Sequence, residues 1–427
     1  MTQAVVDVPA WPKFDPFSDA LRDEPHEMLA GVHDRAPVFF EGRLGAWVLT
    51  RYADVAEALR DTETFSSSDI NGLIPTPPEL LDRVPDLNSR SFTLVLGMDP
   101  PAHGPVRLPM QRAMAHRLVG PVAPLARQAA EDLIDGFIDA GSCDLVNDFA
   151  YPFSGRAIAA VLGLPADEAD KYSAWFERFG GLFSRRPLKS RGEVGDPIHE
   201  FTPAEVHDKW AELAEANELL RNHVLERQAE PRDDVISIML GMKDREGKPM
   251  NDVGDVVRAL LTLLGGGQDT TANLVAAVAT LLTQNPDQKS LLMDDLSLLP
   301  GAIEEAMRLR GPGVGLVRKT TRAVELQGVS IPSESLIYLS LYGANLDPDV
   351  FEDPGRFDIR RPNASKHLGF GLGRHACVGQ PLARLEAEIA LEALYRRIPG
   401  LDVDPGQPHG YKPHFTSSIL TTLRASW

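Results

Sequence analysis

The chain has 427 residues, a hydrophobic content of 43% and a formal net charge of -18 at pH 7. This length and composition suffice for a large buried core and exclude a mainly disordered chain. The acidic balance argues against nucleic acid and anionic membranes as main partners. The 2 cysteines are too few for a disulfide scaffold or a four-cysteine metal site.

The N-terminal segment contains neither a basic region nor a long apolar one, so no signal peptide is predicted. No apolar run reaches the roughly eighteen residues that a membrane span needs. The best candidate, Val256–Leu264, contains Arg258 and is followed by glycines. We therefore expect a soluble, cytoplasmic protein without a transmembrane helix.

The first elements alternate between short regular segments and a long loop. Pro37–Thr50 places two apolar runs around a glycine-containing turn, which predicts a β-hairpin. Helical spacing follows in Tyr52–Leu59 and again in Leu118–Leu164. Between them, Ser66–Leu96 is rich in proline and irregular, which is typical of a functional loop.

The second half contains the longest predicted helices. Ala169–Phe183 carries an aromatic helical face that fits either an ordinary core or a lid over a pocket, and Glu205–Gln228 is amphipathic. Val253–Gln284 is apolar almost all round, so it should be a buried helix. Val317–Leu339 predicts short strands, and Pro381–Arg397 predicts a last helix before a strand-like C-terminus. The fold class expected is mainly α with a smaller β portion (α+β), in a single domain.

Cys377 lies in a glycine-rich segment, His367–Glu386, directly before a helix opened by Pro381. The free N–H groups and positive dipole end of that helix favour a thiolate. The glycines let the backbone approach a flat, bulky group, against which Phe370 can lie. These features suit a haem iron held by one cysteine thiolate. The alternative is an inert, buried cysteine beside a glycine-rich turn.

A second unusual segment lies midway along the long apolar helix. Gly265, Gly266 and Gly267 each cost a helix about 1 kcal/mol, and Asp269 is costly to bury without partners. A flat ligand that approaches the backbone explains both features. A close helix–helix crossing with a hydrogen-bonded Asp-Thr pair is the alternative.

The pattern Phe370-Gly371-x-Gly373-x-His375-x-Cys377-x-Gly379 resembles the cysteine-ligand loop of bacterial cytochromes P-450. The resemblance extends from the hairpin near residue 40 to the final strand. It implies the cytochrome P-450 fold, a triangular helical prism with haem b between a long distal helix and the proximal cysteine loop. Cys377 is then the iron ligand, and the cofactor contacts include Gly266, Phe370, Gly371, His375 and Gly379.

The same resemblance assigns roles to residues of the distal helix. The segment from Gly266 to Thr271 is similar to the acid–alcohol pair of the family. Asp269 would relay protons, which is general-acid chemistry, while Thr270 would hold the oxygen and a water. The thiolate would favour O–O cleavage.

Other charged residues are assigned a role only by the resemblance, from their order along the chain. Glu305 and Arg308 are similar to the E-x-x-R pair, with Arg356 as the third member of a structural trio, although alone they could form a surface salt bridge. Four basic residues would contact the haem propionates: His103, Arg107, Arg318 and His375. An arginine suits a carboxylate because its guanidinium donates two parallel hydrogen bonds.

Two segments depart from the family pattern. Asn345-Leu346-Asp347-Pro348 replaces the frequent Asn-Arg-Asp-Pro turn, and the stretch before Arg318 is rich in glycine, which leaves the pocket shape open. The residues predicted to line the substrate pocket are Leu264, Gly265, Val314, Val317 and Ile419. Their apolar character favours a small, largely apolar substrate, such as a terpenoid or a small aromatic molecule.

The predicted function is a haem-thiolate monooxygenase that inserts one atom of O2 into its substrate, usually as hydroxylation. No flavin or nicotinamide domain is visible, so a separate ferredoxin-like protein and its reductase would supply electrons. We expect the ferredoxin to dock on a basic proximal patch of Arg112, His116, Arg117, Arg374 and Arg384. These charges could instead pair locally with Glu386 and others.

Three other functions are alternatives to this one. A haem-thiolate peroxygenase, isomerase or dehydratase would not need the Asp269–Thr270 pair. A haem-binding sensor would need an effector domain, and none is visible. A cysteine hydrolase using Cys377 and His375 is disfavoured because these residues are only two positions apart. The sequence assigns no role to Cys143.

Overall fold

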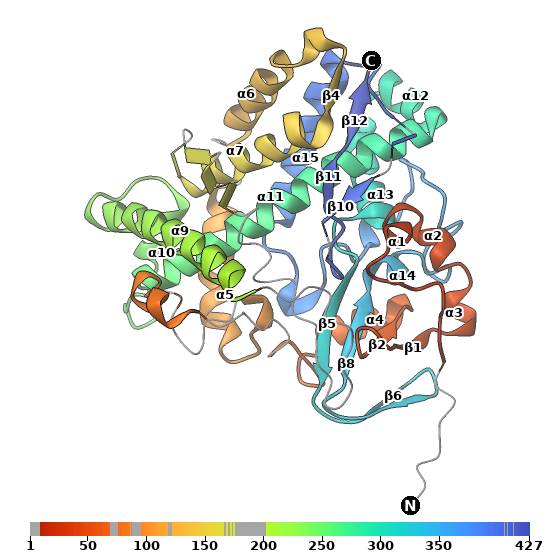
Figure 1. Ribbon diagram of the computed structural model, residues 1–427, viewed down its shortest axis with the longest axis horizontal. Helices are drawn as coiled ribbons and strands as arrows, with labels where there is room; N and C mark the ends of the chain where they lie inside the picture. The colour runs from red at the N-terminus through yellow and green to blue at the C-terminus, as the bar shows by residue number, and fades with distance from the viewer. Residues whose placement is uncertain are drawn as a thin grey trace, which may run out of the picture.

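The computed structural model describes the chain with gaps. The described residues are 9–68, 76–85, 87, 95–117, 122–165, 168–169, 171–172, 174–175, 202–404, 406–407, 409–412 and 414–427; of His116 and Arg117 only the backbone is described. Helices make up the larger part of the molecule, and the main β-sheet lies at one side with the first short helices (Figure 1). The mainly α fold class with a smaller β portion is confirmed.

The described helices have the following bounds: α1 (Asp19–Asp23), α2 (Pro25–Met28), α3 (Val32–Arg35), α4 (Tyr52–Arg60), α5 (His103–Arg117), α6 (Val122–Asp135), α7 (Tyr151–Leu162), α9 (Pro203–Ala229), α10 (Val235–Gly241), α11 (Val253–Gln284), α12 (Pro286–Asp294), α13 (Leu299–Arg310), α14 (Leu341–Asn345) and α15 (Gln380–Arg397). α11 crosses the middle of the molecule and contacts α7, α9, α13 and α15 (Figure 1). It begins with a reciprocal capping box between Asp252 and Asp255 and ends before Pro286. The predicted bounds of this helix are confirmed.

The main sheet has the strand order β1-β2-β8-β5-β3. Its bounds are β1 (Val38–Glu41), β2 (Ala46–Leu49), β8 (Leu336–Ser340), β5 (Gly315–Thr320) and β3 (Phe65–Ser66). The predicted hairpin forms β1 and β2, and β2 then pairs in parallel with β8. The remaining pairings are antiparallel. The sheet thus joins the first part of the chain to its last third.

Three smaller sheets complete the β portion. They contain β4 (Ser142–Asp144) with β12 (Arg424–Ser426) and β9 (Asp402–Val403), β10 (Gly410–Tyr411) with β11 (Leu420–Thr422), and β6 (Val324–Leu326) with β7 (Val329–Ile331). The turn between β6 and β7 uses Gln327 and Gly328, both at positive φ.

Two predicted segments need correction or fall outside the described residues. Leu118–Leu164 is not continuously helical: α6 and α7 are separated by β4, which follows Gly141 in the left-handed region. Of the predicted aromatic face, Trp175 is buried against Tyr172 in a hydrophobic core, with ring centroids 5.8 Å apart. Phe176, Phe179 and Phe183 lie outside the described residues, as does much of the predicted loop after Ser68.

Candidate active site

The loop that carries Cys377 is shaped by its glycines. Gly371 and Gly373 have φ values of 66° and 71°, and a Cβ at Gly373 would lie 2.8 Å from the carbonyl oxygen of Leu59. The N–H of Cys377 donates to the carbonyl oxygen of Phe370 at 2.8 Å, which closes the loop. The side chain of Cys377 is left exposed just before α15. The sequence therefore folds to present a thiol at a helix N-terminus.

The electrostatics at the Cys377 sulfur are mixed. Desolvation by the surrounding protein atoms raises the pKa of the Cys377 thiol, although part of the side chain is exposed. The N–H groups of Gly379 and Gln380 and the charges of Arg107 and Arg384 lower that pKa, but they do not reverse the direction. The expected stabilisation of a thiolate is present but incomplete. A metal ion bonded to the sulfur would complete it, because coordination deprotonates a thiol.

The adjacent glycines of α11 have different surroundings. A Cβ at Gly267 would lie 3.0 Å from Ile158 of α7, so this glycine permits close helix packing. A Cβ at Gly266 would meet nothing within 4 Å, and Gly266 is exposed. Thr270 donates from Oγ1 to the carbonyl oxygen of Gly266 at 2.6 Å. The helix-crossing alternative thus explains Gly267, while the open side at Gly266 can accept a flat group.

The carboxylate of Asp269 has few partners in the structure. Its Oδ1 is buried and has no hydrogen-bond partner among the described residues, while the Nζ of Lys412 lies 3.6 Å away. The amide of Asn273 donates to the Asp269 carbonyl oxygen at 2.7 Å. Two residues after Asp269, the hydroxyl of Thr271 is hydrogen-bonded to Glu386, a buried side chain of α15. Helix α15, which follows Cys377, therefore contacts α11 beside the Asp269–Thr270 pair.

Four basic side chains predicted to bind propionates lie together. The rings of His103 and His375 have centroids 4.4 Å apart, Arg107 donates to the carbonyl oxygen of Ala376, and Arg318 comes from β5. We call them the cationic cluster. A nitrogen of each member is buried without a hydrogen-bond partner in the structure: His103 Nε2, Arg107 Nε, Arg318 Nε and His375 Nε2.

The pKa directions in the cationic cluster have one main cause. Burial, followed by the charges of Arg318 and His103, lowers the pKa of His375 to about 4. Burial lowers the pKa of Arg318 to about 10, and the pKa values of His103 and Arg107 are lowered as well. Asp99, which the sequence analysis missed, opposes part of this effect. Two buried guanidinium charges and two buried imidazoles, each with a partnerless nitrogen, are what two carboxylates of a ligand would satisfy.

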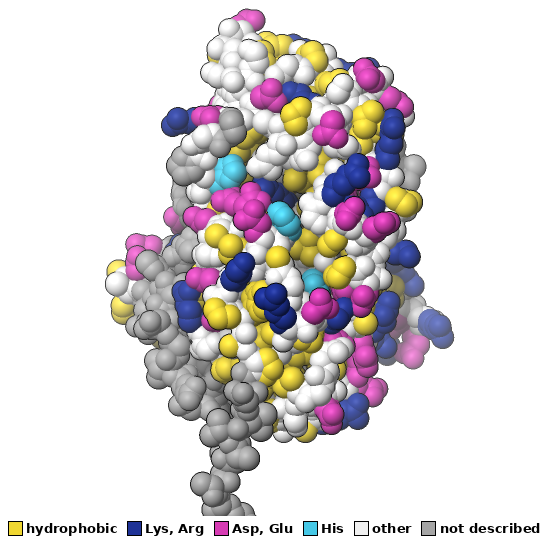
Figure 2. All heavy atoms as spheres, turned by 90° about the vertical axis from the view of Figure 1, so that its right-hand side faces the viewer, with side chains coloured by type: hydrophobic (Ala, Val, Ile, Leu, Met, Phe, Trp, Pro, Cys, Tyr) yellow, Lys and Arg dark blue, Asp and Glu magenta, His cyan; other side chains and the backbone are white. Residues whose placement is uncertain are grey.

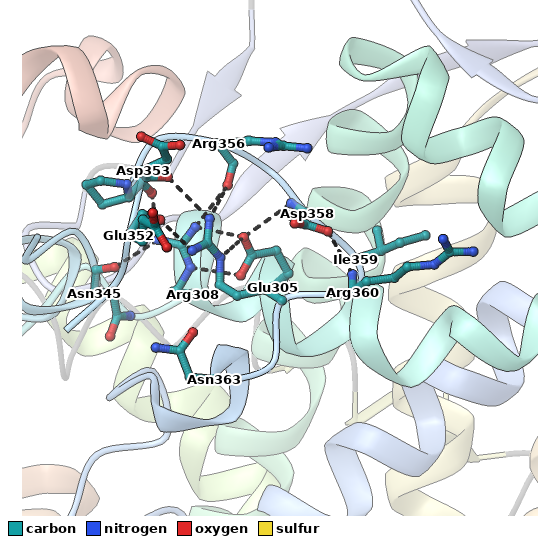
Figure 3. Close-up of polar contacts among 12 residues, drawn as sticks. Glu305, Arg308, Asn345, Glu352, Asp353, Arg356, Asp358, Ile359, Arg360 and Asn363 are labelled. Atoms are coloured by element: carbon teal, nitrogen blue, oxygen red, sulfur yellow. Dashed lines mark hydrogen bonds and ion pairs between the residues drawn. The ribbon is translucent and has the colours of Figure 1, made fainter.

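Glu305 and Arg308 form a second buried cluster, with both side chains fully buried. Arg308 donates from Nε and Nη2 to Glu305 at 2.8 and 2.7 Å, and to the carbonyl oxygens of Asn345 and Pro354 (Figure 3). The prediction for the third member was wrong. Arg361 pairs with Glu305 at 2.8 Å, whereas Arg356 offers only its carbonyl oxygen, and its guanidinium points away (Figure 3).

The predicted pocket-wall segments come together from two parts of the chain. The N–H of Val314 donates to the carbonyl oxygen of Thr416 at 2.9 Å, and Gly313 bridges with Ser417. The side chains of Leu264, Val314, Val317 and Ile419 are all buried. Their role as a substrate wall stays a prediction, because burial alone does not separate a wall from ordinary core.

The predicted docking residues are only partly described. Arg112 and Arg374 are exposed, while the side chains of His116 and Arg117 lie outside the described residues. Arg384 pairs with Glu304 at 2.9 Å and lies 4.7 Å from the ring centroid of Phe370. The local-pairing alternative therefore holds for Arg384, with Glu304 rather than Glu386 as its partner.

Two further features limit other kinds of site. Burial, with Asp148 and Asp144 nearby, raises the pKa of Cys143 to about 12, so this thiol is a poor nucleophile or ligand. Within the described parts of the chain, no group of three or more His, Cys, Asp or Glu side chains could hold a metal ion.

None of the described helices has the length and apolar character to cross a membrane.

Comparisons with known proteins agree on one family. The sequence profile of the family described as Cytochrome P450 matches residues 188–398. The chain is 35% identical over 387 residues to the cyclomarin C epoxidase of Salinispora arenicola, covering 90% of this chain and 91% of that one. It is 31% identical over 397 residues to the vitamin D(3) 25-hydroxylase of Pseudonocardia autotrophica, covering 92% and 91%.

A solved structure gives the same result. The haem domain of a cytochrome P450 from Tepidiphilus thermophilus superposes with a TM-score of 0.82 at 25% identity, covering 97% of this chain and 96% of that one. The chain belongs to the cytochrome P450 family. Members of this family are monooxygenases that bind haem b and use O2 with redox partners.

Proposed function

We propose that this chain acts as one catalytic domain in which Cys377 is the iron ligand of haem b. The observation that carries the proposal is the cationic cluster, whose partnerless buried nitrogens fit the two propionates of a haem. The exposed thiol of Cys377 and the open side of α11 at Gly266 fit the two faces of the same flat group.

When bound, the haem supplies the iron at which O2 is activated. The residues of α11 then manage protons and water on the distal side. The Thr270 hydroxyl donates to the Gly266 carbonyl oxygen, so its own oxygen atom can accept a hydrogen bond from a water. Asp269 has a buried Oδ1 that is not committed to a hydrogen bond within the structure, so its carboxylate can take up a proton and release it.

The substrate we propose is largely apolar and lies between α11 and the paired segments at Val314 and Ser417. The apolar side chains of Leu264, Val314, Val317 and Ile419 support this class. The relatives widen the range of substrate sizes to consider, since one is named a vitamin D(3) hydroxylase and another an epoxidase of cyclomarin C. Hydroxylation and epoxidation are therefore both candidate outcomes.

We propose a ferredoxin-like protein as the electron donor, docked by exposed basic residues such as Arg112 and Arg374. On the face that Figure 2 shows, Lys and Arg side chains are interspersed with Asp and Glu rather than gathered in one patch. An electrostatic docking site elsewhere on the protein would make reduction slower at high salt. Reduction rates that do not change with ionic strength would contradict this docking proposal.

The iron ligand is tested with the ferrous CO adduct of the purified protein. We expect the strongly red-shifted Soret band of a thiolate-ligated haem in the wild-type protein and its loss in Cys377→Ala. Retention of that band in Cys377→Ala would refute the assignment of the ligand. Cys143→Ala is the matched control, because Cys143 lies in β4 with its thiol held protonated.

The substrate class is tested by titrating the ferric protein with terpenoids, small aromatic acids, fatty acids, steroids and vitamin D(3). A ligand that displaces an iron-bound water shifts the Soret band to shorter wavelength. A near-complete shift with one class identifies the substrate family. Turnover of that ligand by peroxide as fast as by a ferredoxin chain would favour a peroxygenase instead.

A further inference from the structure

The C-terminal β10–β11 hairpin reaches α11 at the turn that carries Asp269. The N–H of Leu420 donates to Oδ1 of Asn273 at 2.6 Å, and Nδ2 of Asn273 donates to the Asp269 carbonyl oxygen at 2.7 Å. In the same hairpin, Nζ of Lys412 lies 3.6 Å from Oδ1 of Asp269. The hairpin thus contacts both the backbone and the carboxylate of Asp269.

The surroundings of Lys412 hold its ammonium group at this place. Its backbone N–H donates to the carbonyl oxygen of Ile419 at 2.8 Å, which fixes the residue across the hairpin. Its Nζ also lies 5.1 Å from the ring centroid of Tyr151 at the start of α7, a distance suited to a cation–π contact. The ammonium group is therefore held between an aromatic ring and the Asp269 carboxylate.

The separation between Lys412 and Asp269 matters for chemistry. At 3.6 Å the two groups attract each other as an ion pair, but the distance exceeds that of an ordinary hydrogen bond. Both side chains are partly exposed, at 29% and 27%, although the Oδ1 atom that faces Lys412 is itself buried. A charge at this distance can bias the orientation of the carboxylate without forming a hydrogen bond to it.

We propose that Lys412 is a positioning residue for Asp269, which it holds from the C-terminal hairpin. The proposal rests on the proposed function, in which Asp269 handles protons. Ile419 of the predicted substrate wall belongs to the strand–turn segment that is hydrogen-bonded to Lys412. The ion pair and the predicted substrate wall therefore share one hairpin.

The test compares Lys412→Met, Lys412→Arg and Asp269→Asn in the haem-loaded protein. A surrogate ferredoxin and its reductase supply electrons in air without added substrate, and O2 consumption in H2O and D2O and released hydrogen peroxide are measured. Lys412→Met should change the peroxide share and the solvent isotope effect by about two- to fivefold, as expected for a partly exposed ion pair. Lys412→Arg should restore wild-type values because it keeps the charge.

Lys289→Met is the matched control. Its Nζ lies 2.7 Å from Asp402 of β9 and donates to the carbonyl oxygen of Leu401, so it also joins a helix to a C-terminal strand, away from the Asp269 turn. We expect wild-type values for this variant. Equal changes in Lys289→Met and Lys412→Met would mean that the loss of any such ion pair changes the peroxide share and the isotope effect, and the proposal would be wrong.

Thermal unfolding of the haem-loaded protein provides a readout other than activity. The Tm decrease of the Lys412→Met, Asp269→Asn double variant should be smaller than the sum of the single decreases, because the two residues interact. Additive decreases would overturn the proposal. If Asp269→Asn changes neither the isotope effect nor the peroxide share, the proposed role of Asp269 fails. If only Lys412→Met is without effect, the role of Lys412 alone fails.

Discussion

Two buried clusters of basic and acidic residues differ in one respect. In one, the polar groups find all their hydrogen-bond and charge partners within the protein, and in the other they do not. In the cluster of Glu305, Arg308 and Arg361, carboxylate and guanidinium groups pair with one another and with backbone carbonyls. In the cationic cluster, a nitrogen of every member lacks a partner in the structure. A satisfied cluster needs no further partner, whereas an unsatisfied cluster that contains two buried arginines indicates a ligand of opposite charge.

The largest effect should follow from breaking the satisfied cluster. Arg308→Met leaves the Glu305 carboxylate buried with fewer partners, which typically costs about 3–5 kcal/mol. We expect a strong fall in Tm and in the yield of folded protein. Arg356→Ala is the control, because its guanidinium points away from the cluster (Figure 3). A similar loss in both variants would contradict the corrected assignment.

The cationic cluster should respond to a substitution in the opposite way. Arg318→Met removes one buried charge whose Nε has no partner in the structure, so we expect little loss of Tm but faster release of haem. A lost hydrogen bond to a charged group costs about 1.5–3 kcal/mol, which corresponds to roughly ten- to a hundredfold. Transfer of haem to an acceptor protein measures the rate. Unchanged transfer together with a much lower Tm would mean that Arg318 is structural.

Glu386 gives a smaller effect that depends on pH. Burial raises the pKa of Glu386 to about 8, while the hydrogen bond from Thr271 opposes this rise. The unfolded chain ionises this carboxyl at a lower pH, so the folded state loses stability as pH rises from the unfolded pKa to about 8. Glu386→Gln should therefore raise Tm above pH 8, by the equivalent of about 1–3 kcal/mol, and change it little near pH 4.

The matched control for this prediction is Glu388→Gln, which changes an exposed side chain of the same helix. Unfolding is followed by circular dichroism at several pH values. A stability–pH curve that stays the same in Glu386→Gln would show that the carboxyl is not held neutral in the folded protein.

The smallest effect separates the neighbouring glycines of α11. Gly267→Ala should lower Tm, because its Cβ would lie 3.0 Å from the buried Ile158 side chain, which must then move within the core, at a cost of about 1–3 kcal/mol. Gly266→Ala meets no protein atom and gains about 0.5–1 kcal/mol in helix propensity. We expect it to keep its Tm but to alter the Soret band. Identical behaviour of the two variants would contradict a ligand beside Gly266.

The local features of the site could be predicted from the sequence, while the partners brought by the fold could not. The bounds of α11 follow from its apolar run and its caps, and the glycine pattern identifies the Cys377 loop. The contacts of Arg361, Lys412 and Glu386 were missed because each is made with a residue on another element. Arg356 lies close in sequence to Arg361, the actual partner of Glu305, and was mistaken for it because sequence spacing does not reveal the direction of a side chain.

The parallel pairing of β2 with β8 has a consequence for how the protein folds. Leu49 and Leu339 are partners in this ladder, although nearly the whole middle of the chain lies between them. Contacts between residues so distant in sequence form late and slow the folding of a chain. The cationic cluster also takes its members from α5, β5 and the Cys377 loop. During synthesis the cofactor pocket can therefore close only after the ribosome has released most of the polypeptide, which leaves haem insertion as a late step of biogenesis.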